Sequence, residues 1–482
     1  MKNPVLVAAV AGGKASGLAT RLLGRGGGTA LPGLVAQKIY PGVLRALTSQ
    51  LPRGSIMVTG TNGKTTTSRM LGSILEEAGL EPLHNRSGSN LERGLISTVI
   101  GAATAAGGLP AGLHMGLFEV DEAAMPVVLP SIRPRVALFN NLFRDQLDRY
   151  GEIDAIMRKW RAAVPKLDRT STLVLNADDP AIASLAGVQG LKAKPLLFGV
   201  DDARYALDAL PHAADSISCP RCNSRLDYSL ILLGHLGHWS CPACGLQRPR
   251  PDVVATHIQL NGTQTSVVHL STPTGTMEVL LQVPGLYNVY NGLAAASAAF
   301  AFGISAEQIK RGLEKFSAAF GRIERVKVPG TDDKDLLMAL VKNPVGFNEV
   351  LRMLFPLEER VGDVPPSGKH LLIIINDLTA DGRDVSWLWD VDFEILSVQP
   401  GSVSGVTISG IRAADMAVRL KYAGLDATLI KIEEKVEDAL SSALDSMPHG
   451  ETLYVLPTYT AMMAFRKMLY EKGWVGDRFW EQ

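Results

Sequence analysis

Two patterns of apolar residues alternate along the chain. Short continuous apolar runs predict buried strands, and apolar residues that recur every three to four positions predict amphipathic helices, as in Thr65–Ala78, which ends before Gly79. The two patterns take turns from Ser55 onward, which favours a parallel sheet with helices on both faces. The strands predicted in the first half are Ser55–Thr59, Gly116–Val120, Val136–Asn140, Thr172–Asn176 and Pro195–Gly199.

A polar, turn-rich segment from about Ser218 to Arg250 interrupts the alternation and holds all four cysteines. After it, Val253–Leu260 and Thr265–Leu270 predict a hairpin, and Gly292–Phe302 predicts an alanine-rich helix. The polar segment Pro329–Asp335 then predicts a linker to a second α/β domain. The strands predicted there are His370–Ile375, Gly405–Ser409, Ala427–Ile432 and Thr452–Leu456, and the helices are Ala413–Ala423, Lys435–Met447 and Thr460–Glu471.

Length and composition agree with a multidomain protein. At about 150 residues per domain, 482 residues correspond to about three domains. We expect an N-terminal helical segment over residues 1–50, an α/β domain over residues 51–328 with an insertion at 218–250, and a C-terminal α/β domain over residues 329–482. With 46% apolar and 20% charged residues, the chain is not disordered as a whole. The 48 basic and 48 acidic residues exclude a whole-chain attraction to nucleic acid.

The N-terminal segment combines basic and apolar residues at helical spacing. Lys14, Arg21 and Arg25 alternate with Leu18 and Leu22, which predicts a basic amphipathic helix. Packing on the next domain is the simpler interpretation, contact with a membrane surface is the sharper one, and a cleaved signal peptide is the third. Apolar runs in the sequence fall short of the roughly 20 residues of a membrane span. We therefore expect a cytoplasmic protein, with the inner face of the plasma membrane as its contact if the helix binds lipid.

A phosphate loop is predicted at GTNGKTTT, which starts at Gly60, follows a predicted strand and begins a predicted helix. In that context backbone N–H groups face the phosphates, Lys64 reaches the β- and γ-phosphates, and Thr65 binds Mg²⁺. Val58 stands where the usual pattern has its first glycine, so the loop is a variant. The alternative is a glycine-rich turn that only begins a helix. The predicted nucleotide ligands in the loop are Gly60, Thr61, Asn62, Gly63, Lys64, Thr65 and Thr66.

The same string resembles the ATP loop of the Mur ligase superfamily. Those enzymes, like folylpolyglutamate synthases, activate a carboxylate as an acyl phosphate and join it to an amine. Five further segments resemble motifs of the superfamily in the same order: Phe118–Val120, Asn141–Tyr150, Asn176–Asp179, Gly285–Asn291 and Gly321–Glu324.

The resemblance implies a nucleotide site that extends well beyond the loop. It implies ATP and Mg²⁺ as cofactors, with Glu119 as the ligand of a second Mg²⁺ ion and with Glu119 and Lys64 both acting in catalysis. It also implies that the nucleotide is contacted by Asn176, Asn288 and Arg322.

Three departures from the superfamily pattern matter. Gln146 replaces a metal-binding histidine, although its amide oxygen suits Mg²⁺. Counted without gaps, the superfamily's carbamylated lysine falls at Arg161, which cannot be carbamylated, while Lys159 points elsewhere on a helix. Val341–Pro344 stands in place of the C-terminal D-x-A-H-x-P segment. The ATP half therefore resembles the superfamily, and the half that holds an amino acid does not.

The four cysteines form two C-x₂-C pairs that are separated by 18 residues. This spacing is typical of a zinc ribbon, in which four thiolates close a tetrahedral structural site and leave no position for water. Disulfides or unrelated thiols are the alternative. His235 and His238 are expected at the surface or in the shell around the metal site, not as ligands. Because arginines lie nearby, a ribbon that binds nucleic acid remains an alternative. The predicted zinc ligands are Cys219, Cys222, Cys241 and Cys244.

The predicted strand His370–Ile375 leads into an acidic loop with two tryptophans, Asn376–Asp390. Loops at the carboxyl ends of parallel strands are where α/β sheets bind ligands, although on composition alone an acidic loop with capping aspartates is the plainer interpretation. This loop and Lys342–Leu351 resemble the MurT family, which comprises the Mur-ligase-like subunits of lipid II isoglutaminyl synthases and also carries a four-cysteine insertion.

The resemblance to that family covers almost the whole chain. It implies an α/β protein: a Mur-ligase-like central P-loop domain with a parallel sheet and an inserted four-cysteine zinc ribbon, followed by a second, Rossmann-like α/β domain. It implies ATP-dependent amidation of the D-glutamate α-carboxyl of the lipid II stem peptide to D-isoglutamine through an acyl phosphate. A separate glutaminase subunit would form a heterodimer with this chain and supply the ammonia. An aspartate of this chain would complete the glutaminase triad: Asp384, with Asp381 and Asp390 as alternatives.

Two other functions stay open on the sequence alone. A Mur- or folylpolyglutamate-type ligase that joins a free amino acid to a carboxylate conflicts with Arg161 and with Val341–Pro344. A non-catalytic P-loop and zinc-ribbon module that binds nucleic acid conflicts with the net charge of zero and with the nucleotide set of Glu119, Asn176 and Arg322.

Overall fold

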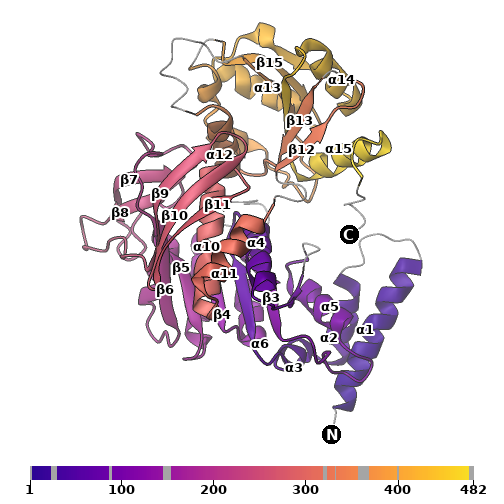
Figure 1. Ribbon diagram of the computed structural model, residues 1–482, viewed down its shortest axis with the longest axis vertical. Helices are drawn as coiled ribbons and strands as arrows, with labels where there is room; N and C mark the ends of the chain where they lie inside the picture. Colours follow the sequence, from indigo (N-terminus) through magenta and orange to yellow (C-terminus); the bar gives the residue numbers. More distant parts are fainter. Residues whose placement is uncertain are drawn as a thin grey trace.

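The computed structural model describes residues 3–22, 30–85, 89–144, 153–317, 323–331, 333–356, 368–398 and 401–476. The N-terminal helices and the C-terminal domain lie at opposite ends of the molecule, and the central sheet domain joins them (Figure 1).

A nine-stranded sheet forms the central domain, in the order β11-β10-β9-β6-β5-β4-β1-β3-β2. The strands from β2 across to β9 are parallel, and β9, β10 and β11 are antiparallel. The strands are β1 (Ser55–Thr59), β2 (Pro82–His84), β3 (Met115–Glu119), β4 (Val136–Phe139), β5 (Thr172–Asn176), β6 (Lys194–Val200), β9 (Val253–Asn261), β10 (Thr265–Thr272) and β11 (Gly275–Leu281).

Helices cover both faces of this sheet, which is why β1 and β3 are buried along their whole length. Val58 and Leu117 point to the face covered by α4, α10 and α11, whereas Met57 and Phe118 point to the face covered by α6 and α8. The helices are α4 (Lys64–Glu77), α6 (Met125–Ile132), α8 (Ile153–Ala163), α9 (Pro180–Ala183), α10 (Leu286–Phe302) and α11 (Ala306–Lys315). The predicted fold class is confirmed.

The N-terminal segment is helical, as predicted. It comprises α1 (Pro4–Leu22), α2 (Leu31–Ile39) and α3 (Val43–Thr48), and it packs against α5 (Glu92–Ala102). Leu6, Ala9 and Val10 of α1 join the same apolar core as α5, so packing on the next domain is one confirmed role of this segment. Among the described residues, no helix is long and apolar enough to cross a membrane.

The cysteine-rich insertion lies between β6 and β9. Its centre is an antiparallel hairpin of β7 (Asp227–Leu233) and β8 (Leu236–Ser240), and one cysteine pair lies on each side of that hairpin. Trp239 packs with Leu226, Cys219 and Cys241 in a small apolar core of the insertion.

The C-terminal domain has a six-stranded sheet in the order β12-β13-β17-β14-β15-β16. β12 is antiparallel to β13, and the other pairs are parallel. Its strands are β12 (Ile323–Lys327), β13 (Asp335–Ala339), β14 (Lys369–Ile374), β15 (Val403–Ser409), β16 (Ile430–Ile432) and β17 (Thr452–Pro457). Its helices are α12 (Pro344–Leu354), α13 (Ala413–Tyr422), α14 (Val436–Ser446) and α15 (Tyr459–Glu471).

The predicted linker Pro329–Asp335 is wrong. This segment is the turn between β12 and β13, so the second sheet begins at Ile323, inside the range 51–328 that we assigned to the central domain. Polar residues with proline and glycine suit a hairpin turn as well as a linker, which explains the error. The alternating pattern also missed β11 and α12.

Candidate active site

The phosphate loop lies between β1 and α4, where the sequence predicts it. Gly63 has a φ of +81°, and a Cβ at this position would lie 1.9 Å from Oδ1 of Asn291, so only glycine fits. Asn141 braces the loop from outside, because its backbone oxygen accepts from Thr61 N at 3.0 Å and its Oδ1 accepts from Asn62 N at 2.8 Å. The loop is therefore held in place by the segment that follows β4.

The lysine of the loop is buried and fully engaged. Nζ of Lys64 donates to the backbone oxygens of Gly60 at 2.7 Å and Thr61 at 3.2 Å, and to Oε2 of Glu122 at 2.8 Å. Burial disfavours the charged ammonium, but the Glu122 carboxylate outweighs this effect and raises the pKa of Lys64. Lys64 therefore stays protonated, with Glu122 as its counter-ion.

Thr65 and Glu119, the two predicted Mg²⁺ ligands, lie together. Oγ1 of Thr65 donates to Oε1 of Glu119 at 3.1 Å. Asn85 fixes the backbone of Glu119, since its Nδ2 donates to Glu119 O at 2.8 Å and its Oδ1 accepts from Glu119 N at 2.9 Å. A hydroxyl and a carboxylate at this distance are the hard oxygen ligands that Mg²⁺ takes, so the donor set fits this ion.

A network of asparagines links α10 to the start of α4. Nδ2 of Asn288 donates to Pro284 O at 2.7 Å, and its Oδ1 accepts from Asn291 Nδ2 at 3.1 Å. Oδ1 of Asn291 in turn accepts from Thr67 Oγ1 at 3.3 Å and from Asn140 Nδ2 at 3.4 Å. The predicted ligand Asn288 therefore belongs to the same polar network as the phosphate loop.

Asn176 ends β5 and is fully buried. Its Oδ1 accepts from Asp178 N at 3.0 Å, while its Nδ2 is a buried donor without an acceptor among the described residues. Thr66 is half-buried in the first turn of α4. Arg322 and Gln146 lie outside the described residues.

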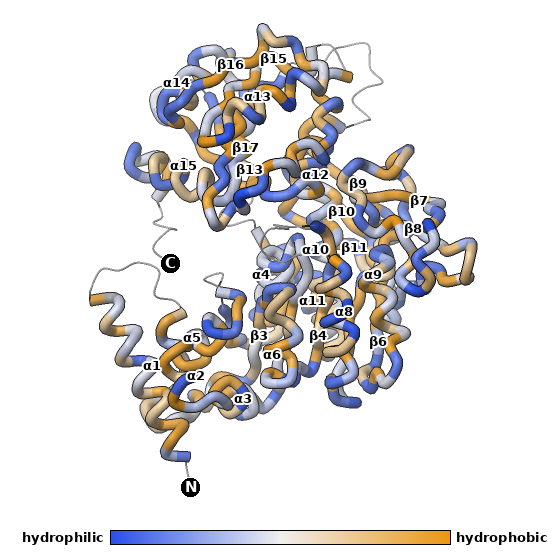
Figure 2. Tube along the Cα trace, turned by 180° about the vertical axis from the view of Figure 1, so that it is seen from behind, coloured by the Kyte–Doolittle hydropathy of each residue, from blue (hydrophilic) through white to orange (hydrophobic). Residues whose placement is uncertain are grey.

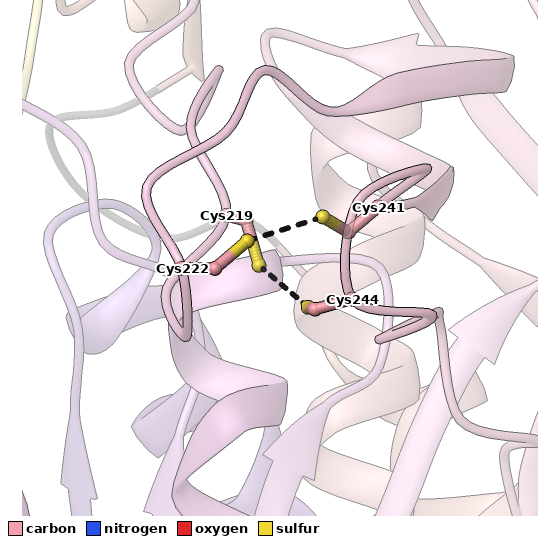
Figure 3. A group of neighbouring side chains, drawn as sticks. All are labelled: Cys219, Cys222, Cys241 and Cys244. Carbon is pink, nitrogen blue, oxygen red and sulfur yellow. Dashed lines mark hydrogen bonds between the residues drawn. The ribbon is translucent and has the colours of Figure 1, made fainter.

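The four cysteines come together, as their spacing predicts (Figure 3). Their sulfurs all lie within 4.8 Å of one another, with 3.6 Å between Cys219 and Cys244 and 3.5 Å between Cys222 and Cys241. Four sulfurs around a tetrahedral zinc at about 2.3 Å are about 3.8 Å apart, so the number, type and closeness of these ligands suit this metal. Hydrogen bonds from the backbone and side chain of Ser224 lower the pKa of Cys222 to about 6, which favours the thiolate.

The two histidines between the cysteine pairs, and Arg161, contact groups other than the four sulfurs. His235 is fully buried against Phe143, with ring centroids 4.6 Å apart, so the expectation of a surface position is wrong for it. His238 is half-buried and lies 3.0 Å from Val200 O. Arg161 donates to Pro220 O at 2.9 Å and so contacts the first cysteine pair.

Asp384 lies in the loop that follows β14, at the carboxyl end of the second sheet. Its side chain is exposed, and its Oδ1 accepts from Ser386 N at 2.8 Å. Hydrogen bonds from the side chain and the backbone of Ser386 lower the pKa of Asp384, so it is ionised at neutral pH.

The two alternative aspartates have structural contacts instead. Asp381 is buried and accepts from Thr460 N at 2.8 Å and from Thr460 Oγ1 at 2.5 Å, which ties the loop to α15. Asp390 is half-buried, and its Oδ2 lies 3.5 Å from Nη2 of Arg144 in the central domain.

The C-terminal domain contacts the phosphate loop directly. Nδ2 of Asn343 donates to Oδ1 of Asn62 at 2.8 Å, and Asn62 Nδ2 returns a bond at 3.5 Å. Oδ1 of Asn343 also accepts from Gly346 N at 2.9 Å and so caps α12. Part of the segment Val341–Pro344 thus faces the nucleotide loop.

Three site residues escaped the sequence analysis: Glu122, Asn85 and Asn343. Glu122 and Asn85 come just after β3 and β2, at the sheet edge where α/β proteins bind ligands, so their position could have found them. Asn343 offered a helix-start signal before Pro344, but its contact with Asn62 spans two domains.

Two family models match the chain. The Mur ligase middle domain matches residues 58–236, and the MurT ligase C-terminal domain matches residues 340–462. The MurT subunit of the glutamine-hydrolyzing lipid II isoglutaminyl synthase from Streptococcus pneumoniae is 32% identical, and the alignment covers 95% of both chains. The corresponding subunit from Staphylococcus aureus strain N315 is 30% identical, with 94% of both chains covered.

Solved structures resemble the whole architecture. A pseudomurein peptide ligase type C from Methanothermus fervidus superposes with a TM-score of 0.62 at 23% identity, covering 88% of this chain and 79% of that one. MurF from Acinetobacter baumannii also gives 0.62, at 20% identity, over 91% of this chain and 80% of its own. At these identities the likeness concerns the fold.

Proposed function

The chain belongs to the MurT family, a branch of the ATP-dependent, amide-forming Mur ligases, and on that premise we propose that it is the amidating subunit of a lipid II isoglutaminyl synthase. The substrate carboxylate, the α-carboxyl of D-glutamate in the lipid II stem peptide, attacks the γ-phosphorus of ATP and releases ADP. Ammonia then attacks the carbonyl carbon of the acyl phosphate. Phosphate leaves as the carbon–oxygen bond breaks, the nitrogen loses a proton, and D-isoglutamine results.

One observation carries this proposal: Lys64, Thr65 and Glu119 meet at a phosphate loop that a MurT-type C-terminal domain contacts through Asn343. Mg²⁺ supplies charge neutralisation for the phosphates. Thr65 and Glu119 would hold this ion, and Lys64 would exchange Glu122 for a phosphate oxygen.

The rest of the nucleotide is assigned to residues around the loop. The backbone of Gly60–Gly63 and the first turn of α4, with Thr66, cradle the phosphates. Asn176, whose Nδ2 is a buried donor without an acceptor among the described residues, and Asn288 would contact the nucleotide beyond its phosphates. Arg322 is the third proposed nucleotide contact, because it lies in the segment Gly321–Glu324 that resembles a nucleotide-binding motif of the superfamily.

A separate glutaminase subunit, in a heterodimer with this chain, is the ammonia source that we propose. All four cysteines of the chain belong to one cluster, so this chain has no thiol to spare for a glutaminase nucleophile. Asp384 is exposed and ionised, which suits a carboxylate that orients a histidine across an interface. Trp389 and Tyr422 nearby are 51% and 73% exposed, with ring centroids 5.6 Å apart, and such aromatic residues are typical of protein interfaces.

We also propose a structural zinc in the cysteine cluster. Four thiolates leave no coordination position for water or substrate, so this metal would hold the ribbon and take no part in amide formation. The nucleic-acid alternative finds little support, because Arg248 of the ribbon is paired with buried Asp178.

We propose that the protein binds an anionic membrane surface through α1. Leu18 and Leu22 are 60% and 78% exposed, and they share a helical stripe with exposed Lys14 because the three residues are four positions apart. Figure 2 shows apolar positions along α1, including its C-terminal end. The sequence has seven basic residues before β1 and no acidic residue before Glu76, which complements a negative surface.

Amidation with ammonium tests the core of this proposal. The purified chain, given ATP, Mg²⁺, ammonium and a D-glutamate-containing stem-peptide substrate, should convert one carboxyl to a carboxamide, detected by mass spectrometry, and release one phosphate per amide. Amidation of another carboxyl would contradict the substrate assignment. Ligation of a free amino acid would support the Mur-type alternative.

A further inference from the structure

Asp178, just after β5, is a fully buried carboxylate that three separate elements contact. Nε of Arg248, from the end of the cysteine insertion, lies 2.7 Å from its Oδ1. Tyr290 of α10 donates its hydroxyl to Oδ2 at 2.7 Å, and Val200 N at the end of β6 donates to the same oxygen at 2.9 Å. Gly199 leaves the space for this arrangement, since a Cβ there would lie 2.5 Å from Oδ1 of Asp178 and 2.6 Å from Nη2 of Arg248.

The cysteine insertion also donates hydrogen bonds to the backbone of Ala177 and Asp178. Trp239 Nε1 donates to Ala177 O at 3.1 Å, and Gly237 N donates to Asp178 O at 3.0 Å. Trp239 also packs in the same small apolar core as Cys219 and Cys241. The position of the hairpin on Ala177–Asp178 is therefore tied to the cysteine cluster.

The same carboxylate adjoins two nucleotide-binding segments. Asp178 N donates to Asn176 Oδ1 at 3.0 Å, so the side-chain orientation of Asn176 depends on the turn that Asp178 forms. Tyr290 lies between Asn288 and Asn291 on α10, the two asparagines that extend the polar network to the phosphate loop. Asp178 thus connects β5 to α10 at the place where each carries a proposed nucleotide ligand.

We propose that the cysteine ribbon positions the nucleotide site, with Arg248, Asp178 and Tyr290 as the positioning residues that transmit its position to Asn176 and Asn288. A metal-loaded ribbon would hold Arg248 on Asp178, and Asp178 would hold the two asparagine-bearing segments at a fixed separation. This inference rests on the proposed ATP site and deepens it: the metal would act on nucleotide affinity and not on the chemical step.

Tyr290→Phe is the most informative variant, because it removes one hydrogen bond to Asp178 and keeps the ring and all charges. Tyr205→Phe is the matched control, since it removes a hydroxyl outside the ribbon that accepts from Leu260 N at 2.9 Å. We expect Tyr290→Phe to weaken nucleotide binding about three- to tenfold, less than the full effect of a lost hydrogen bond to a charged group because Tyr290 acts on the nucleotide indirectly, and to raise KM for ATP with kcat unchanged. Tyr205→Phe should leave KM for ATP unchanged.

Removal of a metal ligand gives a second, independent test of the proposal. The Cys222→Ser variant, with an exposed ligand changed, should bind a fluorescent ADP analogue more weakly than the zinc-loaded chain in the same Mg²⁺ buffer. The loss should be smaller when Tyr290→Phe is already present, because both changes act through Asp178. Unchanged nucleotide affinity in Tyr290→Phe, or a fully additive double variant, would overturn the proposal. If Cys222→Ser and Tyr290→Phe lowered nucleotide affinity as expected but the wild-type chain formed no amide, the result would instead count against the proposed function.

Discussion

Among single residues, Lys64 is the one whose contacts the proposed function would change most. In this structure its three donors are satisfied by two loop carbonyls and by Glu122. A phosphate oxygen can replace Glu122 with little change in charge balance, because one anion takes the place of another. Glu122 therefore serves as the counter-ion that keeps the lysine protonated, and under the proposed function a phosphate of ATP would take its place.

Lys64→Ala should abolish ATP turnover and should also lower stability. Removal of the lysine leaves Glu122 buried without its counter-ion, and loss of one partner of a buried pair costs about 3 kcal/mol. The double variant Lys64→Ala/Glu122→Gln should recover most of that stability, measured by thermal unfolding, and still show no turnover. Wild-type turnover in Lys64→Ala would contradict the phosphate-loop assignment, and equal stability of the single and double variants would contradict the ion pair.

At the scale of elements, three of the proposed nucleotide and Mg²⁺ contacts lie at the carboxyl end of a parallel strand. The loop of Lys64 follows β1, Glu119 ends β3 and Asn176 ends β5, so the sheet brings together residues that are far apart in the sequence. Two elements stand outside this scheme: the cysteine ribbon, which contacts the sheet domain from the side, and α1, which leaves two leucines in solvent.

The ribbon should bind one zinc per chain. Metal analysis of the purified protein should find this stoichiometry, and Cys219→Ser should reduce it to near zero, because three thiolates and a hydroxyl hold zinc far more weakly. Ser229→Ala, an exposed change on β7, serves as the control and should keep full metal content. Full zinc content in Cys219→Ser would contradict the four-cysteine site.

Helix α1 should bind vesicles that contain phosphatidylglycerol and should not bind vesicles of phosphatidylcholine alone. Leu18→Gln/Leu22→Gln should weaken this binding at least tenfold, since each buried leucine contributes about 2 kcal/mol. Val127→Gln removes an apolar side chain on α6 that is 58% exposed, close to the 60% of Leu18, and should bind as the wild type does. Cosedimentation measures all of these. Equal binding by the leucine variant, or no binding by the wild type, would contradict the membrane contact.

For the whole molecule, the sequence predicted what is encoded locally and missed what depends on contacts between distant segments. The phosphate loop, Glu119 and the cysteine ribbon each depend on a short string, so the elements that carry them were predicted closely. Glu122 as the partner of Lys64, and Asn343 as the partner of Asn62, depend on tertiary contacts that no spacing reveals. The segment Pro329–Asp335 was wrongly predicted as a linker, because a turn between two strands and a linker between two domains have the same polar, proline- and glycine-containing composition.

Glutamine hydrolysis on a partner subunit and amide formation on this chain would be separated in space, so one substitution should affect one activity alone. Asp384→Asn keeps the size of the side chain and its hydrogen bond from Ser386 but removes the charge that would stabilise a protonated histidine. In the complex it should reduce glutamine-dependent amidation by at least a hundredfold and leave ammonium-dependent amidation unchanged. Asp377→Asn, in the same loop but paired with Arg412, is the control and should retain both activities. If ammonium-dependent amidation fell equally in Asp384→Asn, this carboxylate would belong to the ligase site, and if neither activity changed, the partner would draw its acid from elsewhere.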